Sequence, residues 1–499
     1  MAISDNIRDA IRRWLLITTP EFDTAYRDQQ AQYKKLYDYA TGKQMPQLRV
    51  REGQADDNII LNFTGLVVER SISLLLGGGV EFDLPGATTQ EMADGKKEII
   101  KSEPAQVLDD IWDTNKKQIL LHKVAQLGSR YGTCYIKIIP EGMESRKFPG
   151  RKIARLIALN PRWMTVETVP EDAEKLARYI TRFEYTGKDS QGQAMTVQRM
   201  ETVEREIGIT KVEEQTLDGQ PVMVERPAET GYWVVRQFVN SQETGGKWQQ
   251  VGKDIQWPYE FPPIIHWQNL PESESPYGVS DIQDILILQD KTNFVSSNLA
   301  KMIRYFAHPF RFGRGLTTSG RIDVGPDSMV NLTGQDATLE QLNSGGDVVG
   351  SMQFANSLRQ AMFDISRTVD VTSLADRLGA LTNFGLRVLF MDALAKLGTK
   401  QELYGDALQE LNHRLLVVSD YADEKADGGK VVWPDPLPTD DLNISNAIVA
   451  QYASGLVSKA TGQERLGYDP EEQARKQAEE GTQEGNVGEK LINAFNRGW

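Results

Sequence analysis

The chain has 499 residues, of which 25% are charged and 40% hydrophobic, with a formal net charge of −14 at pH 7 and a pI near 5.0. This composition is typical of a folded protein with real hydrophobic cores, and the length predicts two to four structural regions. An acidic surface excludes tight, static binding of duplex DNA, because such binding depends on Lys and Arg displacing counterions. It leaves open a smooth acidic passage through which DNA slides.

The single cysteine, Cys134, lies in an apolar stretch and is predicted to be a small core residue. One cysteine excludes an intrachain disulfide framework and is typical of a reducing cytoplasm. Residues 1–13 are charged throughout and do not resemble a signal peptide. The longest apolar tract, residues 59–82, contains polar and charged side chains and is not a membrane span. We therefore expect a soluble, intracellular protein without membrane contact.

The first part of the chain is predicted to be helical. Apolar residues recur at helical spacing over 22–39, 58–76 and 104–127. The second of these helices ends at the glycine run 77–79, which is a strong helix breaker. A phosphate-binding loop needs Lys and Ser or Thr directly after its last glycine, whereas Glu81 would place an acid there. The glycines are therefore interpreted as a helix stop.

From residue 130 to 267 the pattern changes to strands. Runs rich in β-branched and aromatic residues alternate with Gly-containing turns. The predicted strands are 131–139, 151–159, 163–169, 179–185, 195–201 and 232–239. The connections are too short for crossover helices, so we expect an antiparallel meander. Together with the helices on either side, this region predicts an α+β fold.

A long amphipathic helix is predicted from Ser280 to Phe306. Ser280 is suited to cap its first turn together with Gln283, and Asp281 favours the positive end of the helix dipole. An apolar stripe is formed by Ile282, Ile285, Leu286, Val295, Leu299, Met302, Ile303 and Phe306. The polar residues on the other side are Asp284, Asp290, Asn293, Ser297, Asn298, Lys301 and Arg304. Such a helix is suited to stand beside copies of itself, which indicates an architectural protein.

The stretch 307–348 is rich in glycine and carries Arg311, Arg314 and Arg321. These arginines are candidates for contact with DNA phosphates or with an acidic partner. A solvated loop or a contact between subunits explains them equally well, so both interpretations stay open.

Helical spacing returns over 352–369 and again over 384–418. Between these helices, residues 370–383 are small and polar, which suits a flexible loop projecting into a passage or a plain helix–helix connection. The candidate residues of this loop are Arg377, Leu378, Thr382 and Asn383. A strand is predicted at 431–433, and a further helix is predicted to start at 469–470 in the acidic tail.

The sequence offers little that could carry catalysis. Its histidines have no metal-ligand spacing, so no zinc site is predicted; they are His122, His266, His308 and His413. Ser280 lacks the second glycine of a nucleophile elbow. We expect no enzyme activity, no metal and no cofactor.

The order of these parts resembles the portal proteins of tailed bacteriophages, in the branch typical of long-tailed siphoviruses. No single motif is highly specific, and the likeness rests on their order over most of the chain. The matching segments are 58–82, 131–135, 261–263 with 277–282, 288–293, 433–437, 455–458 and 466–469. The small-residue pattern of the family's tunnel loop is matched only loosely, at 378–381.

The resemblance implies an α+β ring subunit with a wing, a stem of long helices, a small α/β clip and a helical crown. The implied regions are the wing 1–278, the stem helix 279–306, the clip 307–350, the second stem helix 351–369, the tunnel loop 370–383, the wing helix and return strand 384–437, and the crown 438–499. Ser280, Asp281, Asp284, Asp290, Asn293, Lys301 and Arg304 would belong to the stem, and the three arginines of 307–348 to the clip.

It further implies a ring of twelve subunits at one vertex of the virion capsid, assembled in the host cytoplasm, through which DNA is packaged and ejected. The implied partners are copies of the chain itself, double-stranded DNA in transit, the terminase large subunit, head–tail connector or adaptor proteins, and the major capsid and scaffolding proteins. Two alternatives stay open: another virion component of the tail or baseplate, and a DNA-processing enzyme.

Overall fold

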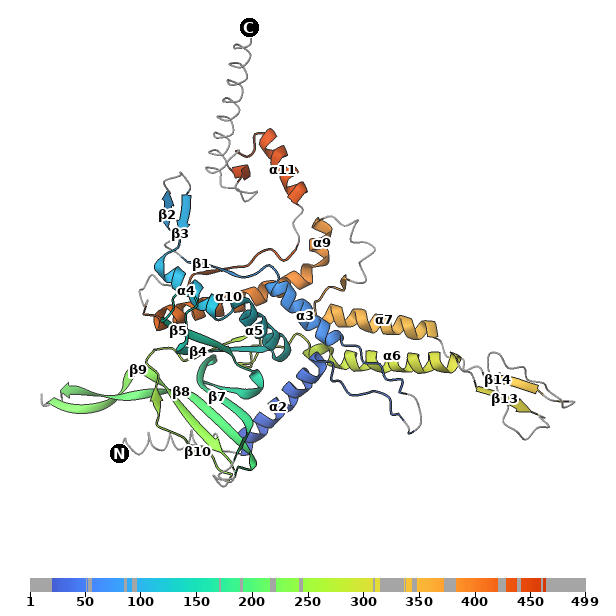
Figure 1. Ribbon diagram of the computed structural model, residues 1–499, viewed down its shortest axis with the longest axis horizontal. Helices are drawn as coiled ribbons and strands as arrows, with labels where there is room; N and C mark the ends of the chain where they lie inside the picture. The colour runs from blue at the N-terminus through green and yellow to red at the C-terminus, as the bar shows by residue number, and fades with distance from the viewer. Residues whose placement is uncertain are drawn as a thin grey trace, which may run out of the picture. The chain divides into compact units, whose positions relative to one another are not determined.

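The computed structural model divides the chain into two compact units, residues 1–374 with 390–434 and residues 375–389 with 435–499 (Figure 1). The residues that the structure describes are 20–50, 52, 56–84, 88–91, 97–169, 172–188, 192–215, 221–241, 246–307, 310–314, 336, 338–342, 348–371, 383–420, 428–437, 441–458 and 461–463.

The helices of the first unit form where apolar residues recur at helical spacing. They are α2 (Pro20–Ala40), α3 (Phe63–Leu76), α4 (Glu103–Thr114), α5 (Lys117–Tyr131), α6 (Leu286–Ala307), α7 (Val348–Ile365) and α10 (Met391–Val418), with short 3-10 turns η1 (Pro161–Trp163) and η2 (Gln283–Ile285). The helix predicted over 22–39 is confirmed by α2. The helix stop predicted at 77–79 is confirmed by the end of α3.

Several of the predicted helices differ from the observed ones, and α7 (Val348–Ile365) begins and ends four residues before the helix predicted over 352–369. The single helix expected over 104–127 is wrong, because Lys116 adopts a left-handed conformation (φ 57°) between α4 and α5. The helix expected over 58–76 begins only at Phe63, where the Asn62 side chain accepts a hydrogen bond from the Gly65 N–H and caps it. The helix expected over 384–418 is interrupted at Phe390.

Antiparallel sheets follow the helices, and the predicted meander is confirmed. The six-stranded sheet contains β6 (Met164–Val169), β7 (Asp172–Lys188), β8 (Ala194–Gln215), β9 (Pro221–Asn240), β10 (Gln249–Gln250) and β11 (Ile255–Gln256). The first five run in the order β10-β9-β8-β7-β6, and β11 also pairs with β9. A three-stranded sheet has the order β12 (Ile264–Gln268), β4 (Thr133–Glu144) and β5 (Lys152–Ala158).

Three two-stranded pairs complete the described strands. They are β1 (Glu81–Asp83) with β15 (Lys430–Val432), β2 (Thr88–Glu91) with β3 (Lys97–Ile100), and β13 (Phe310–Arg314) with β14 (Thr338–Leu342). The strand predicted at 431–433 is confirmed by β15, which returns the chain to the segment after α3.

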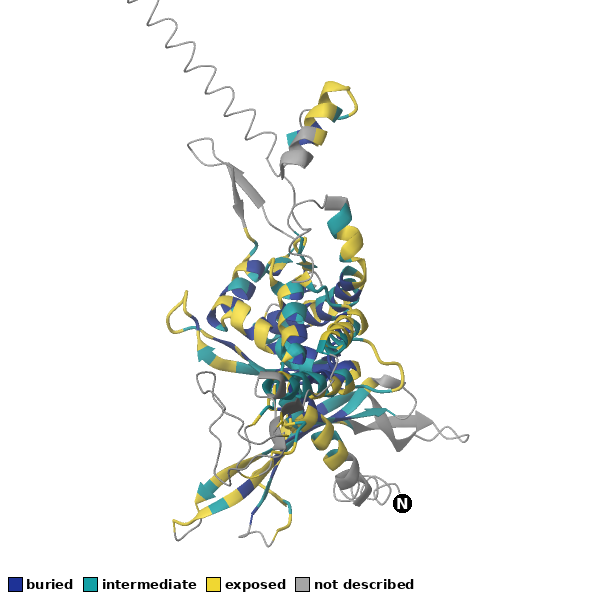
Figure 2. Cartoon of the chain, turned by 90° about the vertical axis from the view of Figure 1, so that its right-hand side faces the viewer, coloured by how far each residue is buried: buried dark blue, intermediate teal, exposed yellow. Residues whose placement is uncertain are grey.

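The main hydrophobic core lies among α3, α4, α5 and α10 and one face of the three-stranded sheet, where Figure 2 shows the buried residues gathering. Cys134 belongs to this core and is 0% exposed, as predicted. A second core joins the three-stranded sheet to the six-stranded one, with Tyr135, Met164 and Trp233 among its members. The chain is thus mixed helix and sheet, consistent with the predicted α+β class.

The second unit is helical where it is described. It contains α9 (Asn383–Leu389) and α11 (Asp441–Ala453), and Arg387 forms an ion pair with Asp435. The helix predicted to start at 469–470 lies outside the described residues. Among the helices that are described, none combines the length and the apolar character needed to cross a membrane.

Candidate functional site

Helices α6 and α7 lie side by side and run in opposite directions, with β13 and β14 beyond their far ends (Figure 1). We name this pair the α6–α7 hairpin. Its distal half contains a shallow groove of about 390 Å³, lined by Val295, Asn298, Leu299, Met302, Gly350, Ser351 and Phe354. The hairpin therefore touches itself along its length but leaves a depression open to solvent.

The apolar stripe predicted for α6 is buried only near its start. Ile282, Ile285 and Leu286 are buried in the main core, but Ile303 is 51% exposed. Large apolar residues are exposed on both helices; they are Ile287, Phe294 and Ile303 of α6 and Val349, Met352, Phe354 and Ile365 of α7. These side chains are candidates for contact with other chains, because contiguous apolar surface usually marks an interaction site.

Part of the polar side of α6 is buried against the chain itself. It faces residues 58–62, which we name the strap. Asn293 Oδ1 accepts a hydrogen bond from the Leu61 N–H at 3.0 Å, and Ser297 Oγ accepts one from the Ile59 N–H at 2.9 Å. The residues of α6 that are 0% exposed on this side are Gln289, Asn293 and Ser297.

The spacing of the two chains explains this match. Four residues of an α-helix rise about 6 Å, and two residues of an extended chain rise about 6.6 Å. Asn293 and Ser297, four positions apart on α6, therefore meet Leu61 and Ile59, which are two residues apart on the strap. Ser297 Oγ also donates to the Ile59 carbonyl at 3.3 Å, and Gln289 Nε2 donates to the Leu61 carbonyl. The side chains involved are neutral, and each such hydrogen bond contributes about 0.5–1.5 kcal/mol.

A buried carboxylate, Asp281, precedes α6. Its side chain is 0% exposed, Lys396 Nζ lies 2.7 Å from Oδ1, and Lys400 Nζ lies 2.5 Å from Oδ2. Burial alone would raise the pKa of Asp281, but the Lys400 and Lys396 ammonium groups outweigh it and hold the pKa well below its usual range. Asp281 is therefore an anion that joins the segment before α6 to α10.

Hydroxyl groups complete this arrangement. Ser129 Oγ of α5 donates to Asp281 Oδ2 at 2.6 Å, and Ser71 Oγ of α3 donates to the same oxygen at 3.0 Å. Lys396 Nζ also donates to the Ser366 carbonyl, directly after α7, at 2.8 Å. Three helices, α3, α5 and α10, thus converge on one carboxylate at the base of the hairpin, and Lys396 links it to the residue after α7. We name Asp281, Lys396, Lys400, Ser71 and Ser129 the Asp281 anchor.

Ser280 does not cap α6, contrary to the prediction. The α-helix begins at Leu286 after η2, and Ser280 Oγ donates to the carbonyls of Ser129 at 3.0 Å and Arg130 at 2.7 Å. A Cβ at Gly132 would lie 2.1 Å from the Gly278 carbonyl oxygen, so the two backbones meet closely at the end of α5. Long-range contacts, rather than a helix cap, fix the start of this segment.

Two arginines hold the end of α7. Arg359 forms an ion pair with Asp370 at 2.9 Å, and Arg70 of α3 donates to the Val369 carbonyl at 2.8 Å. The guanidinium groups of Arg70 and Arg359 lie 5.0 and 5.8 Å from the centre of the Phe363 ring, within cation–π range. The chain is thereby fixed up to the point where the predicted loop 370–383 begins.

The remaining candidate residues of α6 and its approach have different surroundings. Asp284 is exposed, Lys301 is half-buried, and Asp290 accepts a hydrogen bond from the Tyr39 hydroxyl at 2.7 Å. Arg304 forms an ion pair, at 2.6 Å, with Asp57, the residue directly before the strap. Two α6 candidates, Asp290 and Arg304, are thus engaged with the N-terminal part of the chain.

The arginine and loop candidates are placed in part. Arg311 and Arg314 belong to β13, where they pair in register with Gln341 and Thr338 of β14. Asn383 is the first residue of α9. The candidates that lie outside the described residues are Arg321, Arg377, Leu378 and Thr382.

Reactive side chains in the described part of the chain serve packing. Burial lowers the pKa of His266 to about 3, and its ring stacks on Tyr135 with centroids 4.7 Å apart. Burial raises the pKa of the Cys134 thiol to about 12. Among the described residues, no group of three or more His, Cys, Asp or Glu could hold a metal ion.

An α+β body with a firmly anchored helical hairpin, whose outer sides carry exposed apolar residues, defines a subunit of a larger assembly. A model of the family "Phage portal protein, SPP1 Gp6-like" matches residues 22–486. The chain therefore belongs to the phage portal proteins, which are structural, non-enzymatic components of the virion capsid that assemble as oligomeric rings. The comparison with curated proteins finds no match.

The sequence interpretation missed the Asp281 anchor and the strap. Lys396 and Lys400 are four residues apart and lie on the side of α10 that carries its buried apolar residues, where a lysine requires an acidic partner; their exposure is 7% and 3%. That pattern was a usable signal. The uncharged polar residues Gln289, Asn293 and Ser297 recur at every fourth position, which was a weaker signal, because the same pattern is equally typical of a helix face exposed to water.

Proposed function

We propose that the protein forms a ring of twelve copies at one vertex of the capsid, and that DNA enters and leaves through its central channel. The family match over residues 22–486 and the exposed apolar sides of the α6–α7 hairpin support this proposal. The ring docks the terminase large subunit during packaging and head–tail connector proteins afterwards. Major capsid and scaffolding proteins surround it in the head.

The main support for the proposed ring is the distribution of exposed apolar residues on α6. Ile287 and Phe294 are seven residues apart and share one side of the helix. Ile303 lies nine residues beyond Phe294, about half a turn around the helix axis. Each subunit of a closed ring meets its two neighbours through different surfaces. A hairpin with apolar residues on opposite sides suits that arrangement.

The regions of the subunit are assigned within this proposal. The α6–α7 hairpin is the stem, β13 and β14 belong to the clip, and the α+β body is the wing. Residues 370–383 form the tunnel loop, and 438–499 form the crown. The acidic balance of −14 per chain lets DNA slide past without a lasting grip, while arginines such as Arg311 and Arg314 supply brief contacts.

Mass photometry and negative-stain microscopy of the purified protein test the ring. The chain has a mass of 56.0 kDa, so twelve copies give about 670 kDa. Phe294→Asp places a charge on an exposed apolar side of α6 and is expected to abolish the ring. Ile119→Asp is the matched control, because Ile119 is 54% exposed on α5, outside the hairpin.

Holed rings that are lost in Phe294→Asp and kept in Ile119→Asp support the proposal. Single chains at every concentration and salt tested contradict it, as do rings in Phe294→Asp that match those of the unmodified protein. Capsids that lack this protein and still fill with DNA would contradict the channel role.

A further inference from the structure

The turn between β4 and β5 is basic, although the chain as a whole is acidic. Four of the seven residues 146–152 are Lys or Arg, and none is acidic. A Cβ at Gly150 would meet no other atom within 4 Å, so the tip of the turn is open to a partner. The phenylalanine ring at this tip is 46% exposed. We name the large side chains of this segment the basic turn; they are Arg146, Lys147, Phe148, Arg151 and Lys152.

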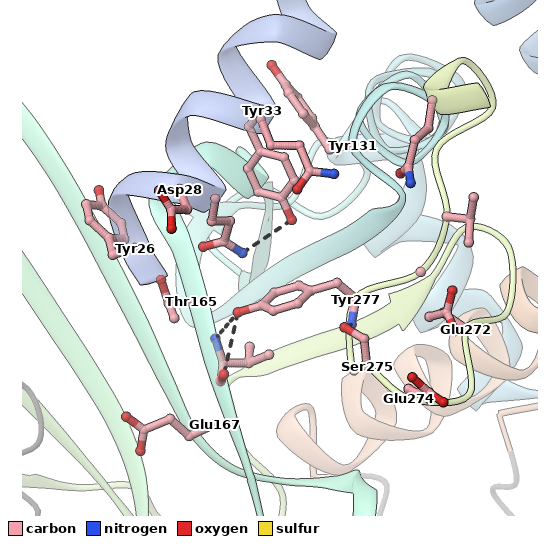
Figure 3. A pocket seen from close by; sticks show the side chains of 16 residues that line it. Tyr26, Asp28, Tyr33, Tyr131, Thr165, Glu167, Glu272, Glu274, Ser275 and Tyr277 are labelled. Carbon is pink, nitrogen blue, oxygen red and sulfur yellow. Dashed lines mark hydrogen bonds between the residues drawn. The ribbon is translucent and has the colours of Figure 1, made fainter. Parts of the chain in front are cut away.

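The body carries the opposite charge in its largest described depression, the cavity between α2, β6 and the loop that precedes Ser280. No Lys, Arg or His belongs to the lining of this cavity, and Figure 3 shows its acidic side chains. They are Asp28, Glu167, Glu272 and Glu274. The cations of the basic turn are therefore a local exception in a chain of net charge −14. Their attraction acts over about 8–10 Å at physiological salt.

Ser145 fixes the backbone of the basic turn. Its hydroxyl oxygen accepts hydrogen bonds from the N–H groups of Lys147 at 3.1 Å and Phe148 at 2.8 Å, and it donates to Asp110 Oδ2 at 2.7 Å. The Ser145 N–H donates to the Arg151 carbonyl at 2.8 Å, and the Arg151 N–H donates to the Phe148 carbonyl at 3.1 Å. Ser145 and Asp110 are both buried. A turn that is held in this way loses little conformational entropy when it binds a partner.

Most of the cations in the basic turn have no acidic partner within the chain. Lys147 Nζ lies 2.7 Å from a carboxylate oxygen of Asp113, and both side chains are largely exposed to solvent. Among the residues that the structure describes, no ion pair engages Arg146, Arg151 or Lys152. The turn thus presents three cations without a counterion beside one exposed aromatic ring.

We propose that the basic turn docks an acidic segment of a partner protein. Carboxylates of the segment meet the three unpaired cations, and an apolar side chain of the segment packs on the Phe148 ring. Arginine and aromatic residues are enriched at the centres of protein interfaces, and a guanidinium binds a carboxylate through two parallel hydrogen bonds.

Duplex DNA fits the basic turn less well than an acidic protein segment. The acidic remainder of the body would repel a long polyanion, and contacts with phosphates alone would leave the Phe148 ring unused. The proposal does not rest on the ring, since the turn lies outside the α6–α7 hairpin.

Fluorescence anisotropy of a labelled peptide, titrated with the full-length protein at low salt, tests the proposal. The acidic probe is the peptide Glu-Glu-Leu-Glu-Glu, blocked at both ends and labelled with a neutral dye. An uncharged probe has Gln in place of each Glu, and a charge-only probe has Ser in place of the Leu. A short DNA duplex is the competing polyanion. The acidic probe is expected to saturate one site per chain and to bind more tightly than the other three.

Arg146→Gln with Lys152→Gln removes two exposed cations from the turn and is expected to weaken binding of the acidic probe about tenfold. Lys34→Gln with Lys253→Gln removes the same charge from exposed positions of α2 and of the loop before β11, and is expected to leave binding unchanged. Phe148→Ser is expected to weaken the acidic probe about threefold and to leave the charge-only probe unchanged. Thermal unfolding curves verify that each variant is folded.

Binding of the acidic probe that weakens in the turn variant and persists in the lysine control supports the proposal. The proposal is overturned if the acidic probe does not saturate, if the uncharged probe binds as tightly, or if the control weakens binding as much as the turn variant. Tighter binding of the DNA duplex through the same two cations would overturn it in favour of nucleic acid. Loss of the ring in the turn variant would also overturn it, because the surface would then lie between copies of the chain.

Discussion

Removing the charge of Asp281 should loosen the base of the α6–α7 hairpin. Asp281→Asn keeps the size of the side chain and leaves the Lys396 and Lys400 ammonium groups buried without an anion. The carboxylate now contacts both lysines, at 2.7 and 2.5 Å, and accepts hydrogen bonds from two serine hydroxyls. Breaking a buried ion pair in this way costs about 3–5 kcal/mol, because the remaining charge stays desolvated.

The change is measured as the shift in free energy of unfolding from urea titrations at neutral pH. Asp284→Asn is the control, since Asp284 is an exposed carboxylate three residues further along. Combining Asp281→Asn with Lys400→Met removes one orphaned ammonium and is expected to restore part of the loss. Because the pKa of Asp281 is depressed in the folded state, the carboxylate's contribution to the free energy of unfolding is present above pH 3.8 and is lost as the pH falls further.

Two results would refute this reasoning. The first is an Asp281→Asn variant that unfolds within about 0.5 kcal/mol of the Asp284→Asn control, the range of ordinary surface substitutions. The second is a double variant in which the losses simply add, since the carboxylate and the lysine would then act independently.

Three further outcomes are expected. The imidazole of His266 has a pKa of about 3 in the folded state against an ordinary 6.5, so the fold keeps it neutral. Its contribution to the free energy of unfolding is fully present above pH 6.5 and falls by about 2 kcal/mol between pH 7 and pH 5. His266→Phe should remove this fall, which is measured by comparing the unfolding free energies of the two proteins over that pH range. Asn293→Leu leaves the Leu61 N–H without its acceptor and should cost about 1–3 kcal/mol, whereas Asn298→Leu, on the groove side of α6, should cost less than 1; equal losses would count against the strap. Cys134 should resist iodoacetamide at pH 8 in the folded protein and react fully in urea, because burial raises its thiol pKa to about 12; rapid labelling of the native protein would show that the core opens.

The larger antiparallel sheets and the positions of the main helices were predictable because their signals are local. Alternating β-branched residues gave the strands of the meander, and its short connections implied antiparallel pairing. The break between α4 and α5 was not predictable in this way, since Lys116 is an ordinary residue in a left-handed conformation that packing imposes. The helical spacing of apolar residues continues across Lys116, so it does not reveal the break.

The contacts at the base of the hairpin could not be predicted from the sequence. Ser280 and Asp281 fit the pattern of a helix start, but both are used by partners from α3, α5 and α10 instead. Asn293 was placed on the polar side of α6, but a neutral amide gives no indication of whether it faces water or a backbone. Long-range pairing decided each case, and a single sequence does not encode the partner locally.

The strap has a consequence for the proposed channel, which would be alternately empty and filled with a dense polyanion. Salt and counterions screen charged contacts, but they leave hydrogen bonds between amides, hydroxyls and backbone almost unaffected. The hydrogen bonds of Gln289, Asn293 and Ser297 to the strap therefore hold α6 in place whatever the ionic composition around it. The proposed stem would therefore keep one geometry while the electrostatic environment beside it changes completely.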